Sequence, residues 1–208
     1  MTSLADTILL YHLTHINNLP SILQRESLWS HARIRAHEVS YSDVANQDVQ
    51  TRRERTKIPI GMCGNLHDYV PFYFAPRSPM LYVIGRQHPP QQNMVYFMTN
   101  TAMIQQHCPA FVFTDAHAIR RLTNFYEELT DLDKIDWPIM KATIWTDTDE
   151  DPNRKARRQA EFLVHKEVPL KACLGFAVYD EQIKHRVEQL LQQNGISLPV
   201  AVRKQFYF

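Results

Sequence analysis

The sequence contains little glycine and little cysteine, and both shortages exclude familiar kinds of site. It has only five glycines in 208 residues. Neither GxGxxG nor the phosphate-loop pattern GxxxxGKS/T occurs, so the usual glycine-rich dinucleotide and phosphate cradles are absent. The three cysteines, Cys63, Cys108 and Cys173, lack CxxC spacing, which predicts neither a disulfide framework nor a zinc site. A dinucleotide would have to be held in another way, and we expect no metal.

Long hydrophobic runs are also missing. No stretch approaches the roughly 18 uncharged apolar residues that a membrane span requires. The opening residues, MTSLADTILLYHL, lack the basic start and cleavage site of a secretory signal. We therefore expect a cytoplasmic protein with no membrane partner. A chain of this length with 44% hydrophobic residues can bury one sizeable core, so we expect a single domain spanning 1–208, and a monomer.

Positive charge is not in excess, because the net charge is only +1. The molecule as a whole therefore lacks the strong basic character that often indicates a nucleic-acid partner. Positive charge is instead concentrated in two runs, one of Arg52, Arg53, Arg55 and Lys57 and the other of Arg154, Lys155, Arg157 and Arg158. Such runs are most often solvated helix faces. The alternative is that they bind phosphates beside a reaction site.

The pattern of apolar and aromatic residues predicts mixed α and β structure. Helices are indicated at 17–28, with Asn17 or Asn18 as the cap, and at 180–195, where Gly195 ends the helix. A marginal helix is expected within 37–55, and 117–160 is expected to be irregular and therefore functional or mobile. Strands are predicted at 6–15, within 67–84 (one or two), and at 93–99, 109–115, 161–169, 173–179 and 200–208.

Five motifs follow one another along the chain: YHLTH (11–15), QTRRER (50–55), HDYVPFYFAPRSPMLY (67–82), FVFTDAH (111–117) and QAEFLVH (159–165). The long third motif combines aromatic residues with three prolines, which favours a buried scaffold around a pocket, with the prolines at strand edges or bends. The others are weak individually. An isolated HxT is usually a hydrogen-bonded strand histidine, and a lone Glu161 is usually paired with a nearby arginine such as Arg157 or Arg158.

In this order, the motifs resemble the DarT family, toxins that transfer ADP-ribose from NAD to a base of single-stranded DNA. The resemblance implies an α+β, single-domain ADP-ribosyltransferase-like fold with mostly antiparallel β-sheets and flanking helices. It implies NAD as co-substrate, thymine as the acceptor, and a macrodomain-containing, DarG-like antitoxin as a partner. Segment 37–57 would cover NAD, and segment 117–160 would recognise the DNA, whose modification would block replication.

The resemblance also implies the residues of the site. Glu161 would bond the ribose 2′-hydroxyl and stabilise an oxocarbenium-like transition state. Arg53 would bind the carbonyl oxygens that flank thymine N3, because a guanidinium with a pKa above about 12 is a poor base. The expected NAD contacts are His12, Leu13, Thr14, Ser21, Trp29, Arg53 and Tyr73. The expected DNA contacts are Arg52, Arg55, His117, Arg120, Arg121, Arg154, Arg157 and Arg158.

Four of these NAD contacts are expected to act in defined ways. His12 and Thr14 would donate to ribose or diphosphate oxygens, and the backbone of Leu13 would pair with the nicotinamide carboxamide. Tyr73 would lie against the nicotinamide ring.

Two rival functions remain open. An ADP-ribosyltransferase that modifies guanine, RNA or protein would share the NAD pocket and differ in its acceptor segment. A non-enzymatic module could bind single strands through aromatic stacking and arginines, although it leaves Glu161 without a role. Measuring NAD turnover with and without a single-stranded oligonucleotide distinguishes these two functions from a DNA ADP-ribosyltransferase.

Overall fold

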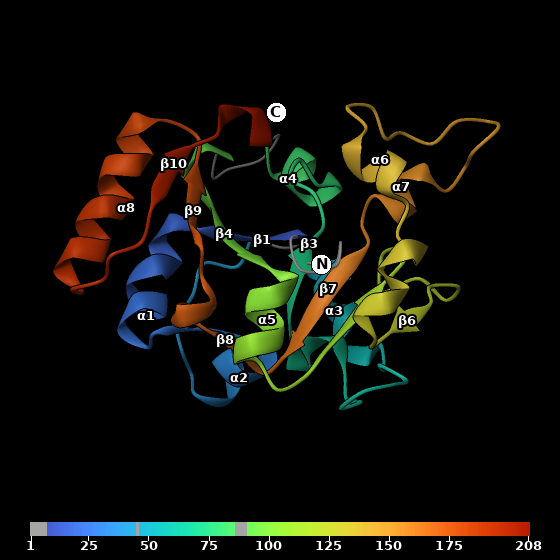
Figure 1. Cartoon of the computed structure of the whole chain (residues 1–208), viewed down its shortest axis with the longest axis horizontal. Coiled ribbons are helices and arrows are strands. Elements are labelled where there is room, and N and C mark those ends of the chain that lie inside the picture. Colours follow the sequence, from blue (N-terminus) through green and yellow to red (C-terminus); the bar gives the residue numbers. More distant parts are fainter. Residues whose placement is uncertain (1–7, 45, 86–90) are drawn as a thin grey trace.

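The computed structural model describes residues 8–44, 46–85 and 91–208, which form a twisted sheet with helices around it (Figure 1). Eight strands pair in the order β10-β9-β4-β1-β3-β7-β5-β6, and a small second sheet pairs β2 with β8. Neighbouring strands are antiparallel except for β9 and β10. The predicted α+β fold with mostly antiparallel sheets is therefore confirmed.

The strands are β1 (Leu9–His15), β2 (Ser27–Trp29), β3 (Tyr69–Tyr73), β4 (Met94–Asn100), β5 (Phe111–Thr114), β6 (Phe125–Tyr126), β7 (Glu161–His165), β8 (Glu167–Pro169), β9 (Gly175–Val178) and β10 (Val200–Val202). The helices are α1 (Leu19–Gln24), α2 (His31–Ala36), α3 (Gln47–Arg55), α4 (Pro79–Ile84), α5 (Thr101–His107), α6 (Trp137–Lys141), α7 (Arg154–Arg157) and α8 (Glu181–Gln193). None of these helices combines the length and hydropathy needed to cross a bilayer.

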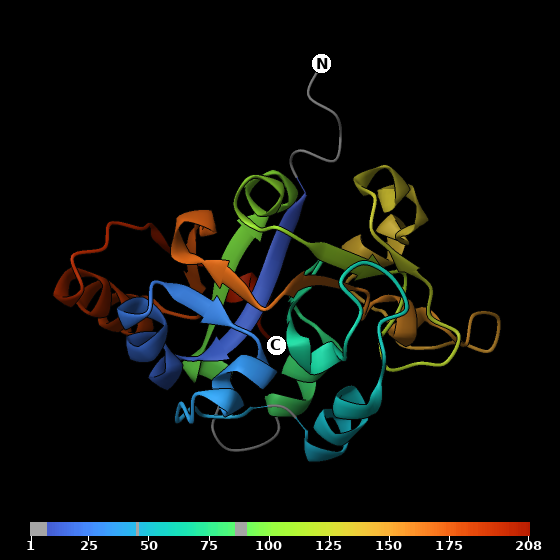
Figure 2. The ribbon, with the colours of Figure 1, turned by 90° about the horizontal axis from the view of Figure 1, so that it is seen from below.

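The centre of the large sheet opens between β1 and β3. Strand β1 pairs with β4 along its whole length, but within the described strands it pairs with β3 only at Tyr11↔Tyr73. Strand β3 pairs fully with β7, from Tyr69↔His165 to Tyr73↔Glu161. The sheet thus consists of two well-paired halves that meet at one point and then diverge, as the view from below shows (Figure 2).

Pro71 stands at this opening, in a strand that lies between two others. Its carbonyl oxygen accepts a hydrogen bond from His12 Nδ1 at 2.8 Å. The N and O atoms of one strand residue point to the same side, so the side of Pro71 that lacks an N–H faces β1, where the strands have separated. The proline therefore removes no hydrogen bond between β3 and β7. Although β3 lies inside the sheet, its side at Pro71 is an unpaired edge, which is the kind of place predicted for the prolines.

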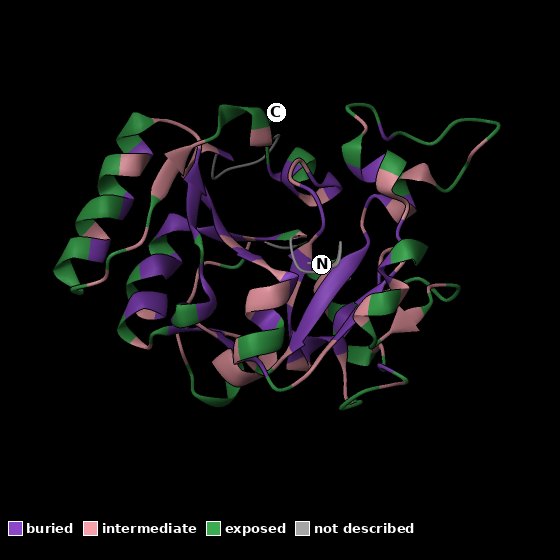
Figure 3. Cartoon of the chain, viewed as in Figure 1, coloured by how far each residue is buried: buried purple, intermediate pink, exposed green. Residues whose placement is uncertain are grey.

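The core is rich in aromatic residues on the strands. Phe72, Phe97, Phe162 and Phe176 are fully or almost fully buried, and the rings of Phe162 and Phe113 stack 6.0 Å apart. Figure 3 shows the central strands buried, while α8 exposes its outer face. Tyr69, Phe72 and Phe74 are all buried, which confirms that the aromatic motif of 67–82 is mainly interior scaffold.

Several predicted elements have different bounds or a different type. Of the one or two strands predicted within 67–84, one forms, β3, and the rest includes helix α4. Ser78 caps this helix by accepting from Leu81 N–H at 3.2 Å, and Pro79 lies in its first turn. The expected strand 161–169 is two strands in two sheets, since Lys166 between them has a φ of 64°.

The other differences are in length. The helix expected within 37–55 begins only at Gln47, after the cap Asn46, and the last predicted strand is limited to Val200–Val202. Helix α1 ends at Gln24, before β2, whereas α8 agrees with the prediction. Segment 117–160 holds only short elements, as expected.

Candidate active site

A cavity of about 430 Å³ lies where β1 and β3 diverge, within the size range of small-molecule sites. Its walls come from β1, α1, residues 41–44, α3, β3 and α4, and Glu161 of β7 also lines it. Every residue that the sequence predicted to contact NAD lines this cavity: His12, Leu13, Thr14, Ser21, Trp29, Arg53 and Tyr73.

Arg53 and Glu161 form a buried ion pair in this cavity. Arg53 Nη1 lies 2.7 Å from Glu161 Oε2, and their side chains are 11% and 2% exposed. The other carboxylate oxygen of Glu161, Oε1, accepts a hydrogen bond from the Ala118 N–H at 3.2 Å. Arg53 Nη2 is buried without a hydrogen-bond partner among the described residues, which leaves a donor for a ligand.

Strand pairing fixes the position of Glu161. It is the first residue of β7, opposite Tyr73, and its own N–H donates to Thr114 Oγ1 at 3.0 Å. The alternative that Glu161 is an edge-strand residue paired with Arg157 or Arg158 is wrong, since its partner is Arg53, 108 residues away in sequence.

His12 lines the same cavity in a neutral form. Burial lowers the pKa of His12 to about 4, and the bond to Pro71 opposes this only in part. A carbonyl oxygen can only accept, so Nδ1 carries the proton and Nε2 is an acceptor. The expectation that His12 donates to a ligand is therefore wrong: it can accept from a hydroxyl. Thr14 Oγ1 accepts from Asn18 Nδ2 at 3.1 Å, so the Thr14 hydroxyl proton remains available for donation.

His117 reaches the same carboxylate from the other side. Its Nε2 lies 3.8 Å from Glu161 Oε1. Burial lowers the pKa of His117, while the charge of Glu161 raises it and the charge of Arg53 lowers it. Burial is the largest of these influences, so His117 is mainly neutral near neutral pH. The residue expected to contact DNA is thus placed next to the proposed catalytic carboxylate.

The remaining predicted NAD contacts form walls. Burial raises the pKa of Tyr73, which therefore keeps its phenolic proton, and Ser21 Oγ donates to the carbonyl of Asn18 at 3.2 Å. Trp29 donates its indole N–H to Glu167 at 3.1 Å, and the guanidinium groups of Arg25 and Arg33 lie 4.7 and 4.3 Å from its ring centre. Its N–H is used within the protein, so it can offer a ligand only the ring.

Sequence reasoning missed several cavity residues. Lys155 and Gln159 line the cavity just before Glu161; the sequence placed Lys155 in the second basic run and Gln159 in the motif QAEFLVH, but assigned neither to a ligand. His31 and His67 also line it, with ring centres 4.1 Å apart, and His67 Nε2 lies 3.0 Å from Gln50 Oε1. No sequence pattern connects these two histidines.

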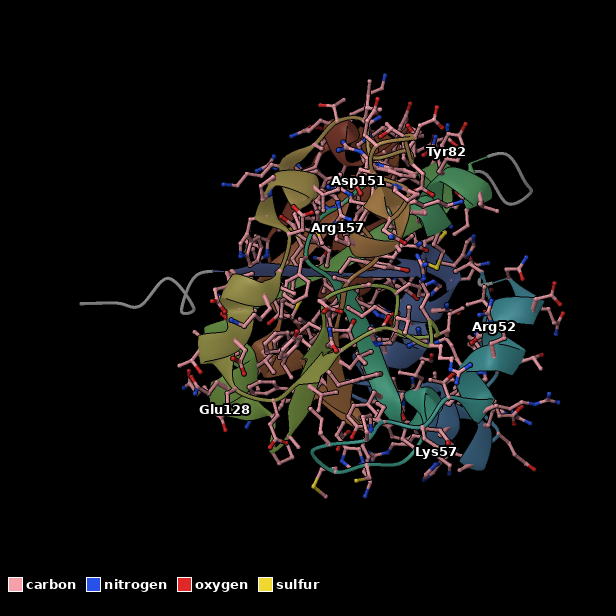
Figure 4. The ribbon with its side chains drawn as sticks, turned by 90° about the vertical axis from the view of Figure 1, so that its right-hand side faces the viewer. Arg52, Lys57, Tyr82, Glu128, Asp151 and Arg157 are labelled. Atoms are coloured by element: carbon pink, nitrogen blue, oxygen red, sulfur yellow. The ribbon has the colours of Figure 1, made fainter. Side chains whose placement is uncertain are left out.

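The predicted DNA-binding arginines fall into two groups. The exposed group, available to a partner, comprises Arg52, Arg55, Arg120 and Arg121. Figure 4 shows Arg52 on α3, apart from Arg157 in this view, while Arg53 of the first basic run and Lys155 of the second both line the cavity.

The second group is held by contacts inside the molecule. Arg158 is 5% exposed and donates to the carbonyl oxygens of Met140, Ile139 at 2.9 Å and Pro76 at 2.6 Å. The prediction that Arg158 contacts DNA is therefore wrong, because the protein covers the side chain and three backbone carbonyl oxygens accept from its guanidinium.

Arg157 and Arg154 belong to the same group. Arg157 pairs with Asp136 at 2.7 Å and Asp151 at 2.6 Å (Figure 4). Arg154 donates to the carbonyl oxygens of Thr146 and Ile144 at 3.1 and 3.0 Å. These contacts brace segment 136–158, and they leave both side chains less available to DNA than the exposed group.

Among the residues that the structure describes, no three of His, Cys, Asp and Glu converge as metal ligands. All three cysteines are free thiols, with Cys63 exposed and the other two buried.

Comparison with known proteins gives consistent results. Residues 11–208 match the model of a family described as ssDNA thymidine ADP-ribosyltransferase, DarT. A DNA ADP-ribosyl transferase of Escherichia coli O127:H6 is 34% identical over 205 residues, which cover 96% of this chain and 93% of the relative. A DNA ADP-ribosyl transferase-DNA ADP-ribosyl glycohydrolase fusion protein of Thermosipho africanus is 24% identical, over 96% of this chain and 49% of its own length.

Solved structures resemble nearly the whole chain. Thermus sp. 2.9 DarT in complex with ADP-ribosylated ssDNA has a TM-score of 0.88 and 33% identity, covering 97% of this chain and 96% of that one. Thermus sp. 2.9 DarT in complex with NAD+ has a TM-score of 0.83 and 32% identity, covering 97% and 98%.

Proposed function

The chain belongs to the DarT family of ssDNA thymidine ADP-ribosyltransferases, and we propose that Arg53 and Glu161 are its catalytic residues. The enzyme transfers ADP-ribose from NAD to thymine in single-stranded DNA, and the cavity between β1 and β3 is where we place NAD. The observation that carries the assignment of the catalytic residues is their buried 2.7 Å contact inside that cavity.

Glu161 is suited to stabilise the developing positive charge on the ribose. Breaking the bond to nicotinamide passes through an oxocarbenium-like state, and a fixed carboxylate in a site shielded from water stabilises such charge strongly. The N–H of Ala118 and the guanidinium of Arg53 hold the carboxylate in one orientation. Thr114 fixes the backbone beneath it.

Arg53 is suited to the acceptor base. Its Nη1 bonds to Glu161, while the buried Nη2 has no hydrogen-bond partner among the described residues. A guanidinium stays protonated at any relevant pH, so it would stabilise the thymine anion through the carbonyl oxygens beside N3. Because thymine N3 is paired in a duplex, an open single strand is the acceptor that this chemistry requires.

NAD would be held by polar atoms of β1. His12 Nε2 can accept from a ribose hydroxyl and Thr14 can donate to a ribose or diphosphate oxygen, in agreement with their hydrogen bonds inside the protein. The backbone of Leu13 would pair with the carboxamide, and Tyr73 would face the nicotinamide ring. Segment 37–57 would cover NAD and segment 117–160 would receive the DNA, both within one domain spanning 1–208.

The biological role follows from the product. A charged adduct on a template base blocks replication, so we propose that this enzyme is a cytoplasmic, monomeric toxin controlled by a DarG-like antitoxin that removes ADP-ribose. The Thermosipho relative, whose name joins a transferase to a glycohydrolase, supports such a pairing.

Mass spectrometry tests the chemistry directly. A mixed-sequence single-stranded oligonucleotide is incubated with NAD and with native protein, Glu161→Gln, or the control Glu188→Gln on the exposed face of α8. We expect a gain of one ADP-ribose, mapped to thymine by fragmentation, with native and control protein, and none with Glu161→Gln. Equal modification by all three proteins would remove Glu161 from the mechanism. If NAD were consumed only when RNA or protein is supplied, the acceptor would be RNA or protein and not DNA.

A further inference from the structure

Asn18 makes contacts that its position in the helix does not explain. It is the N-cap residue of α1, and asparagine at this position normally accepts a hydrogen bond from the first turn of the helix. Its side chain makes no such bond. Pro20, in the first turn, also removes one of the donors that a cap would satisfy. Asn18 is buried, with 8% of its surface exposed, and it lines the cavity.

The amide of Asn18 pairs with the peptide backbone of Ser42. Ser42 N–H donates to Asn18 Oδ1 at 2.7 Å, and Asn18 Nδ2 donates to the Ser42 carbonyl at 3.1 Å. The two residues are 24 positions apart. This two-way bond ties the irregular segment 39–44 to the β1–α1 side of the cavity. Four consecutive residues of that segment, 41–44, line the cavity.

The same side chain also reaches the floor of the cavity. The second proton of Asn18 Nδ2 serves Thr14 Oγ1, 3.1 Å away. Thr14 thereby receives a bond and must direct its own hydroxyl proton elsewhere. Asn18 therefore acts on both sides of the cavity: it holds the covering segment, and it makes Thr14 a donor toward the interior.

Two other hydrogen bonds of segment 39–44 lead to its neighbours in the chain. Val39 N–H donates to the Ile34 carbonyl at 3.0 Å, on α2, and Gln50 Nε2 donates to the Asp43 carboxylate at 3.2 Å, on α3. Both contacts position the segment relative to α2 and α3. The hydrogen bonds of Asn18 position the segment relative to β1, where Val44 also packs against the cluster that includes Tyr11 and Leu13.

We propose that Asn18 is a positioning residue for NAD binding: it fixes segment 39–44 over the cavity and orients the Thr14 hydroxyl toward the dinucleotide. The proposal rests on the proposed function, since it takes NAD as the ligand. When only a fraction of the protein has a competent site, the apparent affinity falls by that fraction. Loss of the tie should therefore weaken NAD binding and leave the chemical step, performed by groups that Asn18 does not touch, nearly unchanged.

The test compares Asn18→Ala and Asn18→Asp with native protein and with Asn17→Ala, a matched control on the exposed neighbouring residue. Asn18→Asp preserves shape and the acceptor for Ser42 N–H, but it removes both donations and sets a carboxylate oxygen against the Ser42 carbonyl. Three quantities are measured: amide hydrogen exchange of residues 39–44 without NAD, the Kd for NAD by calorimetry, and kcat on a thymine-containing oligonucleotide. Where Asn18→Ala unfolds, Asn18→Asp carries the comparison.

For both Asn18 variants we expect exchange in 39–44 and the Kd for NAD to rise about tenfold, as the loss of one or two buried hydrogen bonds would produce, with kcat changed less than about threefold. Asn17→Ala should match native protein. Unchanged exchange or unchanged Kd in both Asn18 variants would overturn the proposal, as would a fall in kcat at constant Kd. Failure of the proposed function has a different signature, because native protein itself would then leave the oligonucleotide unmodified.

Discussion

At the scale of single residues, Arg53 and Glu161 define what the site can do. Two buried charges at 2.7 Å are each other's main compensation, and removing one partner of such a pair leaves an uncompensated charge that typically destabilises a protein by about 3–5 kcal/mol. Alanine variants at either position therefore report folding and catalysis together. Substitutions that keep the shape or the charge separate the two effects.

Arg53→Lys keeps the charge and can still pair with Glu161, but it loses the planar fork that would hold two thymine oxygens. We expect NAD cleavage to water to stay within about threefold of native protein, whereas transfer to thymine falls about 100-fold, as for the loss of one fixed donor at a developing anion. Nicotinamide release and DNA adducts are quantified in parallel by chromatography. Equal losses in both reactions would place Arg53 at the ribose and not at the acceptor base.

The buried histidines predict how stability depends on pH. Burial lowers the pKa of His12 and of His67 to about 4, below the unfolded value of about 6.5. The unfolded chain then binds more protons between these values, so stability is greatest above about pH 6.5 and falls as the pH drops toward 4. Each group contributes a slope of up to about 1.4 kcal/mol per pH unit.

Urea denaturation between pH 4 and 8 measures this effect. Native protein should lose stability steadily below about pH 6.5, and His12→Gln should flatten the slope by up to one proton. The control is the matching substitution of an exposed histidine on α8, His185→Gln. A slope for His12→Gln that equals the native slope would mean that His12 titrates alike in the folded and unfolded states.

At the scale of elements, the turn before β7 depends on Arg158. Its guanidinium joins the carbonyl oxygens of Ile139 and Met140 on α6 to that of Pro76 before α4. Bonds from a charged donor each contribute about 1.5–3 kcal/mol. We expect Arg158→Ala to lower the free energy of unfolding by about 2–4 kcal/mol, while Arg121→Ala, on the exposed turn after His117, leaves it within about 0.5 kcal/mol. Chemical denaturation of the two variants checks both values, and equal stabilities would contradict the bracing role of Arg158.

The same elements show which parts of the fold could be predicted. The aromatic strands with period-two patterns and the capped helix α8 could be predicted, because their signals are local in the sequence. The order of the motifs led to the correct fold, and the residues it assigned to NAD all line the cavity. Helix α4 was missed because its aromatic and β-branched residues outweighed the Ser78–Pro79 start signal. The burial of Arg158 could not be predicted, because a basic run has the same sequence whether carbonyl oxygens or solvent surround each guanidinium.

The divergence of β1 from β3 also lay beyond sequence reasoning. Pro71 indicates that one edge of its strand lacks a donor, but it does not say which neighbouring strand is affected. The answer depends on the pairing of β3 with β7, which brings Tyr73 opposite Glu161. The cavity thus depends on two long-range pairings, of β1 with β4 and of β3 with β7, and no single motif predicts it.

At the scale of the whole molecule, charge distribution sets how DNA binding responds to salt. The net charge is +1, and only four of the seven arginines predicted to contact DNA, namely Arg52, Arg55, Arg120 and Arg121, are exposed. Each phosphate neutralised on a single strand contributes about −0.7 to the slope of log K against log salt concentration. Four contacts give a slope of about −3, whereas all seven arginines would give about −5.

Fluorescence anisotropy of a labelled thymine-containing single strand, with Glu161→Gln protein to prevent turnover, measures this slope between about 50 and 300 mM salt, a range in which phosphate contacts dominate the response. We expect a value near −3 that becomes less steep by about 0.7 in Arg121→Ala, and no change of slope in Arg157→Lys, whose charge is balanced by Asp136 and Asp151. A native slope near −5 would mean that segment 136–158 releases its internal ion pairs when DNA binds, and that the second basic run contacts phosphates after all.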